Sequence, residues 1–147
     1  MIGLRSTAAL ALVFVVVAVS PAKPMSSADV TVVVENLRSA DGDVRIALWS
    51  AADGFTEADS VVAETKQKAQ FGRVIFRLAG LPTGRYAVVS YHDENGNGDF
   101  DRTFLGLPKE GLGFSNGAWI SLGPPAFDEA AVDVEAPNEV IVVKLRY

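Results

Sequence analysis

Six short runs rich in β-branched and aromatic residues constrain the fold of this chain more than any other feature. They cover residues 29–37, 43–50, 72–80, 85–93, 130–136 and 139–147, and Gly, Pro, Asn or Asp residues separate them. Each run has the length and composition of a β-strand bounded by turns. In the second run Val44 and Ile46 alternate with Arg45 and Ala47, as expected of a strand with one wetter face. The pattern predicts a single all-β domain, either a sandwich or a barrel.

Residues 52–70 do not follow this pattern. Phe55, Ala58 and Val61 approach helical spacing, and Thr56 is a candidate N-cap. Two interpretations fit the segment: a short helix that crosses between sheets, or a long loop that contains an edge strand.

The N-terminal segment has the features of a secretory signal peptide. A positively charged start that contains Arg5 precedes an apolar run at residues 8–19, which is shorter than the roughly 20 residues of a membrane-spanning helix. Small residues place the cleavage after Ala22 or after Ala28, and we favour Ala28 because the first predicted strand begins at Asp29. The prediction is a signal peptide at 1–28 and a domain at 29–147. An uncleaved anchor is the alternative, and a lipid-anchored start is excluded because no cysteine follows the apolar run.

The charge and the cysteine content of the chain limit the partners and the cellular location that we expect. Removing Arg5 and Lys23 lowers the basic residues from 13 to 11 against 18 acidic ones, so the mature chain has a net charge of −7. An acidic surface repels phosphate backbones and anionic lipids, which argues against nucleic acid and membrane surfaces as partners. We therefore expect a periplasmic or secreted protein without a membrane span after cleavage, stabilised without disulfides because it has no cysteine.

The stretch HDENGNGDFD, residues 92–101, resembles a calcium-binding loop. Asp, Asn and Gly stand at the alternate positions from which an EF-hand loop supplies oxygen ligands. The predicted metal ligands are Asp93, Asn95, Asn97, Asp99 through its carbonyl, and Asp101. The acidic residue that should close the shell is replaced by Phe104, so the expected affinity is weak, with Glu110 as a distant substitute. An ion-free turn fits the same residues, because Asn and Gly tolerate positive φ and Asx side chains cap turns. Any bound ion is expected to be structural.

Two patterns suggest an enzyme, and neither is well supported. GFSNG at 113–117 matches the nucleophile-elbow pattern around Ser115, but that pattern belongs between a strand and a helix, with a histidine later in the chain. The only histidine, His92, precedes Ser115. His92 beside Asp93 suggests a general base or a zinc ligand, but no cysteine or second histidine is present to complete a zinc site. We therefore predict no catalytic residues, and keep a metal-assisted hydrolase near His92 and Asp93 as the alternative.

Residues 81–118 resemble a bacterial family known as domain of unknown function 2141. The resemblance rests on a P-x-G-x-Y-A-V strand, an H-D-x-N-x-N-G loop and a G-x-P-K-E-G-x-G-F-S-N segment, which here begin at Pro82, His92 and Gly106. It implies a small exported domain with an immunoglobulin-like or transthyretin-like sandwich of about seven strands and no established activity. A transthyretin-like hydrolase shares that fold, but it needs several histidines and a different C-terminal motif, so its activity is not carried over.

The third motif, which begins at Gly106, supplies a second set of candidate site residues. With His92, the residues Lys109, Glu110, Ser115 and Asn116 form a predicted ligand-facing loop. Either these side chains converge with Asp93 and Asp101 on a shared site, or the second loop covers the first without a ligand. Trp49, Tyr91 and Trp119 are similarly ambiguous between a binding surface and the core. The leading prediction is a non-enzymatic envelope module that binds a protein, a glycan or an ion. A structural part of an envelope assembly is the third alternative.

Overall fold

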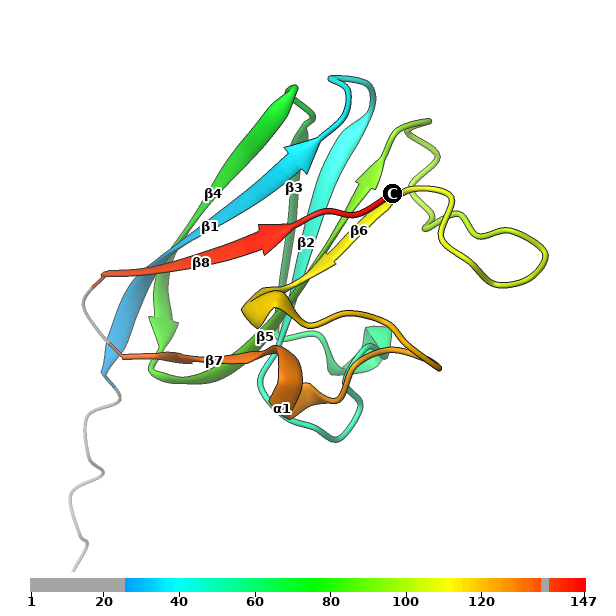
Figure 1. The fold of residues 1–147 in the computed structure, drawn as a ribbon. Coiled ribbons are helices and arrows are strands. Elements are labelled where there is room, and N and C mark those ends of the chain that lie inside the picture. Colours follow the sequence, from blue (N-terminus) through cyan, green and yellow to red (C-terminus); the bar gives the residue numbers. More distant parts are fainter. Residues whose placement is uncertain (1–25, 136–137) are drawn as a thin grey trace, which may run out of the picture.

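A computed structural model describes residues 26–135 and 138–147. The predicted signal peptide therefore lies almost wholly outside the described residues. The chain forms two β-sheets packed face to face (Figure 1). The first sheet has three strands in the order β4-β1-β8. β1 (Ser27–Leu37) pairs antiparallel with β4 (Gly72–Pro82) and parallel with β8 (Asn138–Lys144).

The second sheet has five strands. β3 (Ala63–Lys68), β2 (Asp43–Trp49), β5 (Gly84–Asp93) and β6 (Gly111–Phe114) lie side by side in that order. β7 (Ala131–Val134) pairs with the first half of β5, and β6 pairs with its second half. The remaining elements among the described residues are one helix, α1 (Phe127–Ala130), and two 3-10 turns, η1 (Ala58–Ser60) and η2 (Ser115–Gly117).

The all-β prediction is confirmed, because each of the six predicted runs contains a strand. The undecided segment 52–70 is a loop that ends in the edge strand β3, so the helix interpretation is wrong. Thr56 is not an N-cap: it has a positive φ of 74°, and η1 begins after Glu57. β6 and α1 were not predicted from the sequence, and the described residues contain eight strands where about seven were expected.

The main core lies between the two sheets. β1 contributes Val30, Val32 and Val34, and β2 opposes them with a matching apolar row at Val44, Ile46 and Leu48. The other large apolar side chains that are fully buried in this core are Phe76, Val88, Val134, Val143 and Leu145. Burying a side chain of this size contributes about 1.5–3 kcal/mol. The period-two pattern of the sequence places these rows on one face of each sheet.

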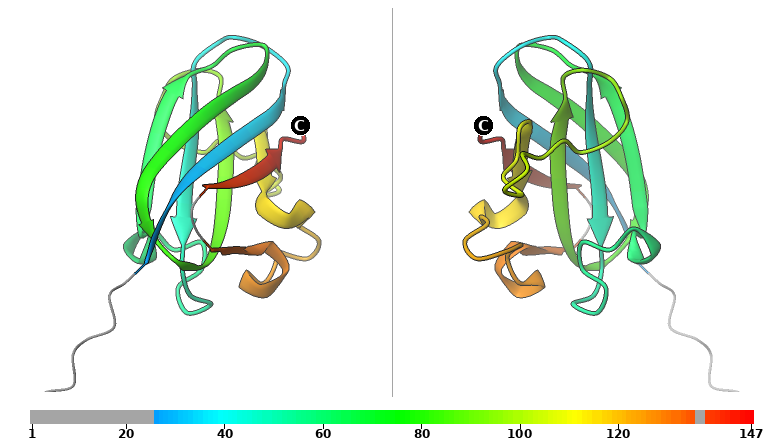
Figure 2. Two further views of the ribbon diagram at one scale, coloured as in Figure 1. Left: turned by 90° about the vertical axis from the view of Figure 1, so that its left-hand side faces the viewer. Right: turned by 90° about the vertical axis from the view of Figure 1, so that its right-hand side faces the viewer.

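A second apolar cluster covers the outer face of the five-stranded sheet. Phe55 stacks edge-on against both Trp49 and Phe127, with ring centroids 5.7 Å apart in each pair. Figure 2 shows the segment that carries Phe55 and the helix α1 at one end of the molecule, while the loop between β5 and β6 stands near the C-terminus. The face of β2 expected to be wetter is therefore partly covered.

No helix among the described residues is long and apolar enough to span a membrane.

Candidate functional site

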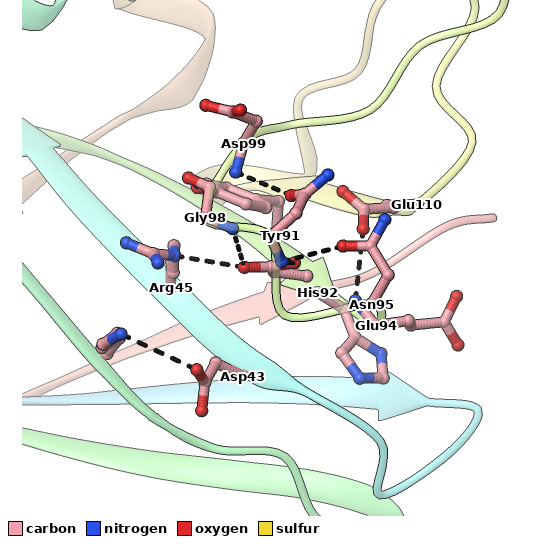
Figure 3. Close-up of polar contacts among 12 residues, drawn as sticks. Asp43, Arg45, Tyr91, His92, Glu94, Asn95, Gly98, Asp99 and Glu110 are labelled. Atoms are coloured by element: carbon pink, nitrogen blue, oxygen red, sulfur yellow. Dashed lines mark hydrogen bonds and ion pairs between the residues drawn. The ribbon is translucent and has the colours of Figure 1, made fainter.

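The loop at 93–101 is organised around the carboxylate of Asp93, which is fully buried. Its Oδ1 accepts a hydrogen bond from the backbone N–H of Asn97 at 3.1 Å, and its Oδ2 accepts one from Gly98 at 2.9 Å. The guanidinium of Arg45 faces the same Oδ2, with Nε at 3.6 Å (Figure 3). Two donors and one cation therefore balance the buried charge and fix the loop to the end of β5.

The two asparagines close the loop on itself. Asn95 Oδ1 accepts the N–H of Asn97 at 2.9 Å, and Asn97 Oδ1 accepts the N–H of Asp99 at 2.8 Å. Their amide groups both donate to Oδ2 of Asp101, at 2.6 Å and 3.2 Å. The Asp99 side chain is exposed to solvent. These are Asx turns that satisfy the backbone locally.

Glu110 reaches back to this loop from the start of β6. Its Oε1 accepts the N–H of Glu94 at 3.2 Å, and its Oε2 accepts the N–H of Asp101 at 3.1 Å. Burial raises the pKa of the Glu110 carboxyl, and the nearby charges of Asp93 and Asp101 raise it further. Lys109 contributes its backbone N–H to the Asp101 carbonyl, while its side chain is exposed. Glu110 thus ties both ends of the predicted metal loop together.

Calcium binding in this loop stays a prediction. Within residues 26–135 and 138–147, no three His, Cys, Asp or Glu side chains are grouped as a metal site. Oxygen atoms of Asp93, Asn95, Asn97 and Asp101 are present at the spacing of a calcium loop, with Glu110 beside them. To bind a cation, the loop must turn the amide groups of Asn95 and Asn97 away from Asp101, so that their oxygens replace their nitrogens.

His92 is fully buried, and both of its ring nitrogens have partners. Nε2 lies 2.7 Å from the carbonyl oxygen of Asp41, and Nδ1 lies 2.8 Å from the hydroxyl of Tyr147. A carbonyl only accepts, so Nε2 carries a hydrogen, and in the neutral ring Nδ1 accepts the tyrosine hydroxyl hydrogen. This arrangement leaves no ring nitrogen for a substrate or a metal.

Ser115 and Asn116 lie at the opposite end of β6 from Glu110. The Ser115 hydroxyl is buried, accepts the N–H of Val88 at 2.8 Å and donates to the carbonyl of Ala130 at 2.6 Å. Asn116 has a positive φ of 55°, and its amide donates to the carbonyl of Glu129 at 2.9 Å. The structure brings Glu110 to the 93–101 loop, but it does not bring Ser115 or Asn116 there.

A groove of about 720 Å³ lies beside the loop, on the outer face of the five-stranded sheet. Strand register sets its floor: Lys66, Arg45, Tyr91 and Leu112 form one row, and Glu64, Ala47, Val89 and Phe114 form the next. Its walls come from the loop that carries Phe100, Arg102 and Leu107 and from the segment 120–124. A groove of this size is within the range of small-molecule sites.

Comparison with known proteins identifies the family. The model for an uncharacterised protein conserved in bacteria, DUF2141, matches residues 32–142. The chain belongs to the DUF2141 family. No curated protein and no solved structure matches it.

The glycines of the third DUF2141 motif have a packing role in this chain. A Cβ at Gly113 would lie 2.7 Å from the carbonyl oxygen of Lys144, and a Cβ at Gly111 would lie 2.6 Å from the Tyr147 ring. Only glycine allows the C-terminal segment to approach β6 so closely. The segment KEGLGFSN therefore joins the loop, β6 and the end of the chain, and its motif residues are explained by the fold.

The groove was not predicted from the sequence, although β5 carries a signal for it. Val88 faces the core between the sheets, whereas Ala87 and Val89 pack against the outer cluster. A strand that is apolar on both faces indicates a second covering layer. Two of the three aromatic residues singled out earlier, Trp49 and Tyr91, line the groove, and Trp119 packs on the outer cluster.

Proposed function

We propose that this DUF2141 domain is an exported, non-enzymatic binding module of the bacterial cell envelope, and that its ligand site is the groove on the outer face of the five-stranded sheet. The groove carries the proposal, because it combines a concave apolar floor with charged side chains at one end. We propose that the scaffold is an immunoglobulin-like or transthyretin-like sandwich. The ligand is a component of the cell envelope.

The non-enzymatic part of the proposal is supported by the polar contacts of the two candidate catalytic residues. His92 uses both ring nitrogens to hold Asp41 and Tyr147, and Ser115 uses its hydroxyl to hold β5 and α1. A nucleophile needs an accessible oxygen and a base within hydrogen-bond reach. Among the described residues the only histidine donates to a carbonyl and contacts a tyrosine.

Export is supported by the sequence that precedes the domain. β1 begins at Ser27, and Ala28 is already buried in the main core. Cleavage after Ala22 would leave this strand whole, while cleavage after Ala28 would remove its first two residues. We propose that the segment ahead of β1 directs the chain out of the cytoplasm.

Within this proposal, the 93–101 loop is a structural calcium loop that stiffens one end of the groove. The support is the concentration of acidic groups. Asp93 and Asp101 lie in one short loop, and Glu110 accepts two of its backbone N–H groups. Burial raises the pKa of Glu110, and its acidic neighbours raise it further. A divalent cation would offset that repulsion. Calcium here has no role in a reaction.

The first experiment tests export and binding on the same material. The full chain is produced in a bacterial host, the periplasmic fraction is separated, and the intact protein is weighed by native mass spectrometry. We expect a shortened chain that begins at Lys23 or Asp29, together with a fraction that carries a non-covalent small-molecule adduct. Recovery of the full-length chain in the cytoplasm would contradict the export part.

Matched variants separate the two parts of the proposal. Val15→Arg with Val16→Arg interrupts the apolar run and should abolish export without changing the domain. Ala47→Phe fills the groove floor and should remove the adduct, while Val140→Phe places the same ring on the exposed face of β8 and should leave it unchanged. An adduct that survives Ala47→Phe would contradict the groove as the ligand site.

A further inference from the structure

The groove has a charge gradient that the strand register imposes. Arg45 pairs with Lys66 on one side and with Tyr91 on the other, so two cations stand in the row next to the 93–101 loop. The next row on the same face passes through Glu64, Ala47, Val89 and Phe114, and Trp49 lies two residues further along β2. Successive rows are about 7 Å apart, since each residue of an antiparallel strand rises about 3.4 Å. The groove is therefore cationic at one end and mainly apolar at the other, with Glu64 at the β3 edge of the apolar row.

Two of the cations in the groove lack a full set of protein partners. Nε of Arg45 is buried without a hydrogen-bond partner among the described residues, and its approach to Asp93 is 3.6 Å. The Arg102 guanidinium lies over the Phe100 ring, 5.2 Å from its centroid, and makes no ion pair within the described part of the chain. Lys66 by contrast reaches Asp43 at 3.7 Å. Because Nε of Arg45 is closed to solvent, the donors that Arg45 and Arg102 offer a ligand at this end of the groove are those of their outer guanidinium nitrogens.

This clustering of positive charge runs against the composition of the chain. The chain carries a formal net charge of −5, yet Arg45, Lys66 and Arg102 line the groove and Glu64 is the single acidic residue that lines it among the described residues. Asp93 faces Arg45 and Asp43 faces Lys66, so the positive potential at this end of the groove comes mainly from Arg102. The complementary ligand carries a negative group at this end.

The mouth of the groove is apolar and unusually exposed. Leu107 is 58 % exposed and Leu122 is fully exposed, and both line the groove. Phe104, 96 % exposed, stands three residues before Leu107 on the same loop. Large apolar side chains grouped at the rim of a concave site indicate contact with an apolar ligand or surface. A sugar or a small polar anion would have no apolar surface to bury against these side chains.

We propose that the groove binds a long-chain alkyl carboxylate, with its carboxylate held by Arg45 and Arg102 and its alkyl chain lying over Ala47, Val89 and Trp49. This inference rests on the proposed function and names the ligand class of that module. Arginine is suited to the head group because its fork of donors matches the two oxygens of a carboxylate. The apolar rows supply the remaining affinity through the burial of the chain.

The test measures the binding of sodium laurate, below its micelle concentration, to the protein purified after expression of the full chain and stripped of lipid. Tryptophan fluorescence and calorimetry should report one site per chain. Dodecanol and dodecyltrimethylammonium have the same chain with a neutral or a positive head, and they should bind at least about ten-fold more weakly, since hydrogen bonds to a charged group are worth more than 1.4 kcal/mol.

Variants of the cationic end identify the carboxylate site. Arg45→Gln and Arg102→Gln should each weaken laurate binding about ten-fold or more. Arg102→Gln is the variant that leaves the fold intact, because the Arg102 side chain is exposed and makes no ion pair in the described part of the chain. Lys68→Gln removes a cation of β3 that does not line the groove and should bind laurate like the parent.

Other results of these binding measurements would contradict the proposal. Equal binding of laurate and dodecanol, or equal binding by the parent and Arg102→Gln, overturns the carboxylate assignment. Self-association that Leu107→Ser and Leu122→Ser abolish, without laurate binding, assigns the rim to a second copy of the chain and overturns it as well. If laurate does not bind, but a native adduct is present in the parent and absent in Ala47→Phe, the proposed binding module is supported and only the ligand class is contradicted. If laurate does not bind and no native adduct is found, both the ligand class and the binding module are contradicted.

Discussion

The hydroxyl of Tyr147 lies 2.8 Å from Nδ1 of His92, so the last residue of the chain is bonded to a side chain at the end of β5. Tyr147 also accepts the N–H of Arg38 at 3.2 Å, and the Arg38 guanidinium lies 4.2 Å from the centre of its ring. Burial raises the pKa of this tyrosine. One side chain therefore joins the turn after β1, the end of β5 and the C-terminus.

Removing this hydroxyl should destabilise the domain. Tyr147→Phe leaves Nδ1 of His92 and the N–H of Arg38 without their partner, and we expect a loss of about 1–3 kcal/mol in the free energy of unfolding, measured in urea. Tyr91→Phe is the matched control, because its hydroxyl makes one long bond of 3.3 Å to Gly98. A smaller loss for Tyr147→Phe than for the control would contradict the role of this contact.

Ser115 should behave as a structural residue. Ser115→Ala leaves the buried N–H of Val88 and the carbonyl of Ala130 without a partner, and should cost about 1–3 kcal/mol in unfolding free energy. A fluorophosphonate probe for activated serines should label neither the parent nor the variant. Labelling that disappears in Ser115→Ala would support the hydrolase alternative instead.

Calcium should raise the stability of the folded chain. With a dissociation constant of about 10⁻⁴–10⁻³ M, calcium at about 10 mM should add about 1.4–2.7 kcal/mol to the free energy of unfolding. The double variant Asp93→Ala and Asp101→Ala should lose this response, and Asp99→Ala, which changes an exposed side chain, should keep it. No change with calcium in the parent would leave residues 93–101 as an ion-free turn.

The ion pair between Arg38 and Glu94 should make part of the stability depend on pH. The hydrogen bond from Arg38 lowers the pKa of the Glu94 carboxyl below its ordinary value of 4.5. A carboxyl whose pKa is lowered by folding stabilises the folded state above its unfolded pKa and loses that contribution as the pH falls through the folded pKa. Glu94→Gln should therefore be less stable than the parent at pH 7, by no more than about 1 kcal/mol for a partly exposed pair.

The difference between Glu94→Gln and the parent should disappear in acid, below the pKa of the ion-paired carboxyl. Melting curves of both proteins between neutral and strongly acidic pH measure this difference. Glu139→Gln is the control, since Glu139 makes no ion pair in the part of the chain that the structure describes. A difference that persists unchanged in acid would show that Glu94 acts through packing and not through its charge.

Gly113 should not tolerate a methyl group. Gly113→Ala places a Cβ 2.7 Å from the backbone carbonyl of Lys144, and overpacking of this kind costs about 1–3 kcal/mol. Gly123→Ala is the matched control, because its Cβ would meet no atom within 4 Å. Urea unfolding of the two variants measures the difference, and equal stabilities would contradict the close approach of β6 to the C-terminal segment.

The strands were predictable because their sequence pattern is local. Each of the six runs is rich in β-branched and aromatic residues and is bounded by turn residues, so its secondary structure does not depend on distant residues. β6 was missed because the four residues GLGF have little strand propensity, and two of them are glycines kept for contact with a distant segment. The edge strand β3, with the sequence AETKQK, was ambiguous because only its first residue is apolar.

The candidate site was predictable only in part. The motif at 92–101 correctly marks a loop that its own Asx side chains close, but the return of Glu110 joins residues 16 positions apart in the chain. The groove needs three further segments to come together over one face of the sheet, and no local pattern records that assembly. Arg45 is an example. The alternation of its strand predicts only that its side chain lies on the wetter face, and the tertiary structure places it between Asp93 and the groove.

The parallel pairing of β1 with β8 has a consequence for how the chain folds. The first strand of the domain bonds to the last one, and the side chain of Asn36 donates to the carbonyl of Leu145 across 109 residues of sequence. The three-stranded sheet can therefore form only after the residues of β8 have been synthesised. Closing such a long loop is slow, since its entropy is lost before the contacts form. Until β8 is present, one edge of β1 has no partner strand, so the first strand of the domain is among the last to gain its full set of backbone hydrogen bonds.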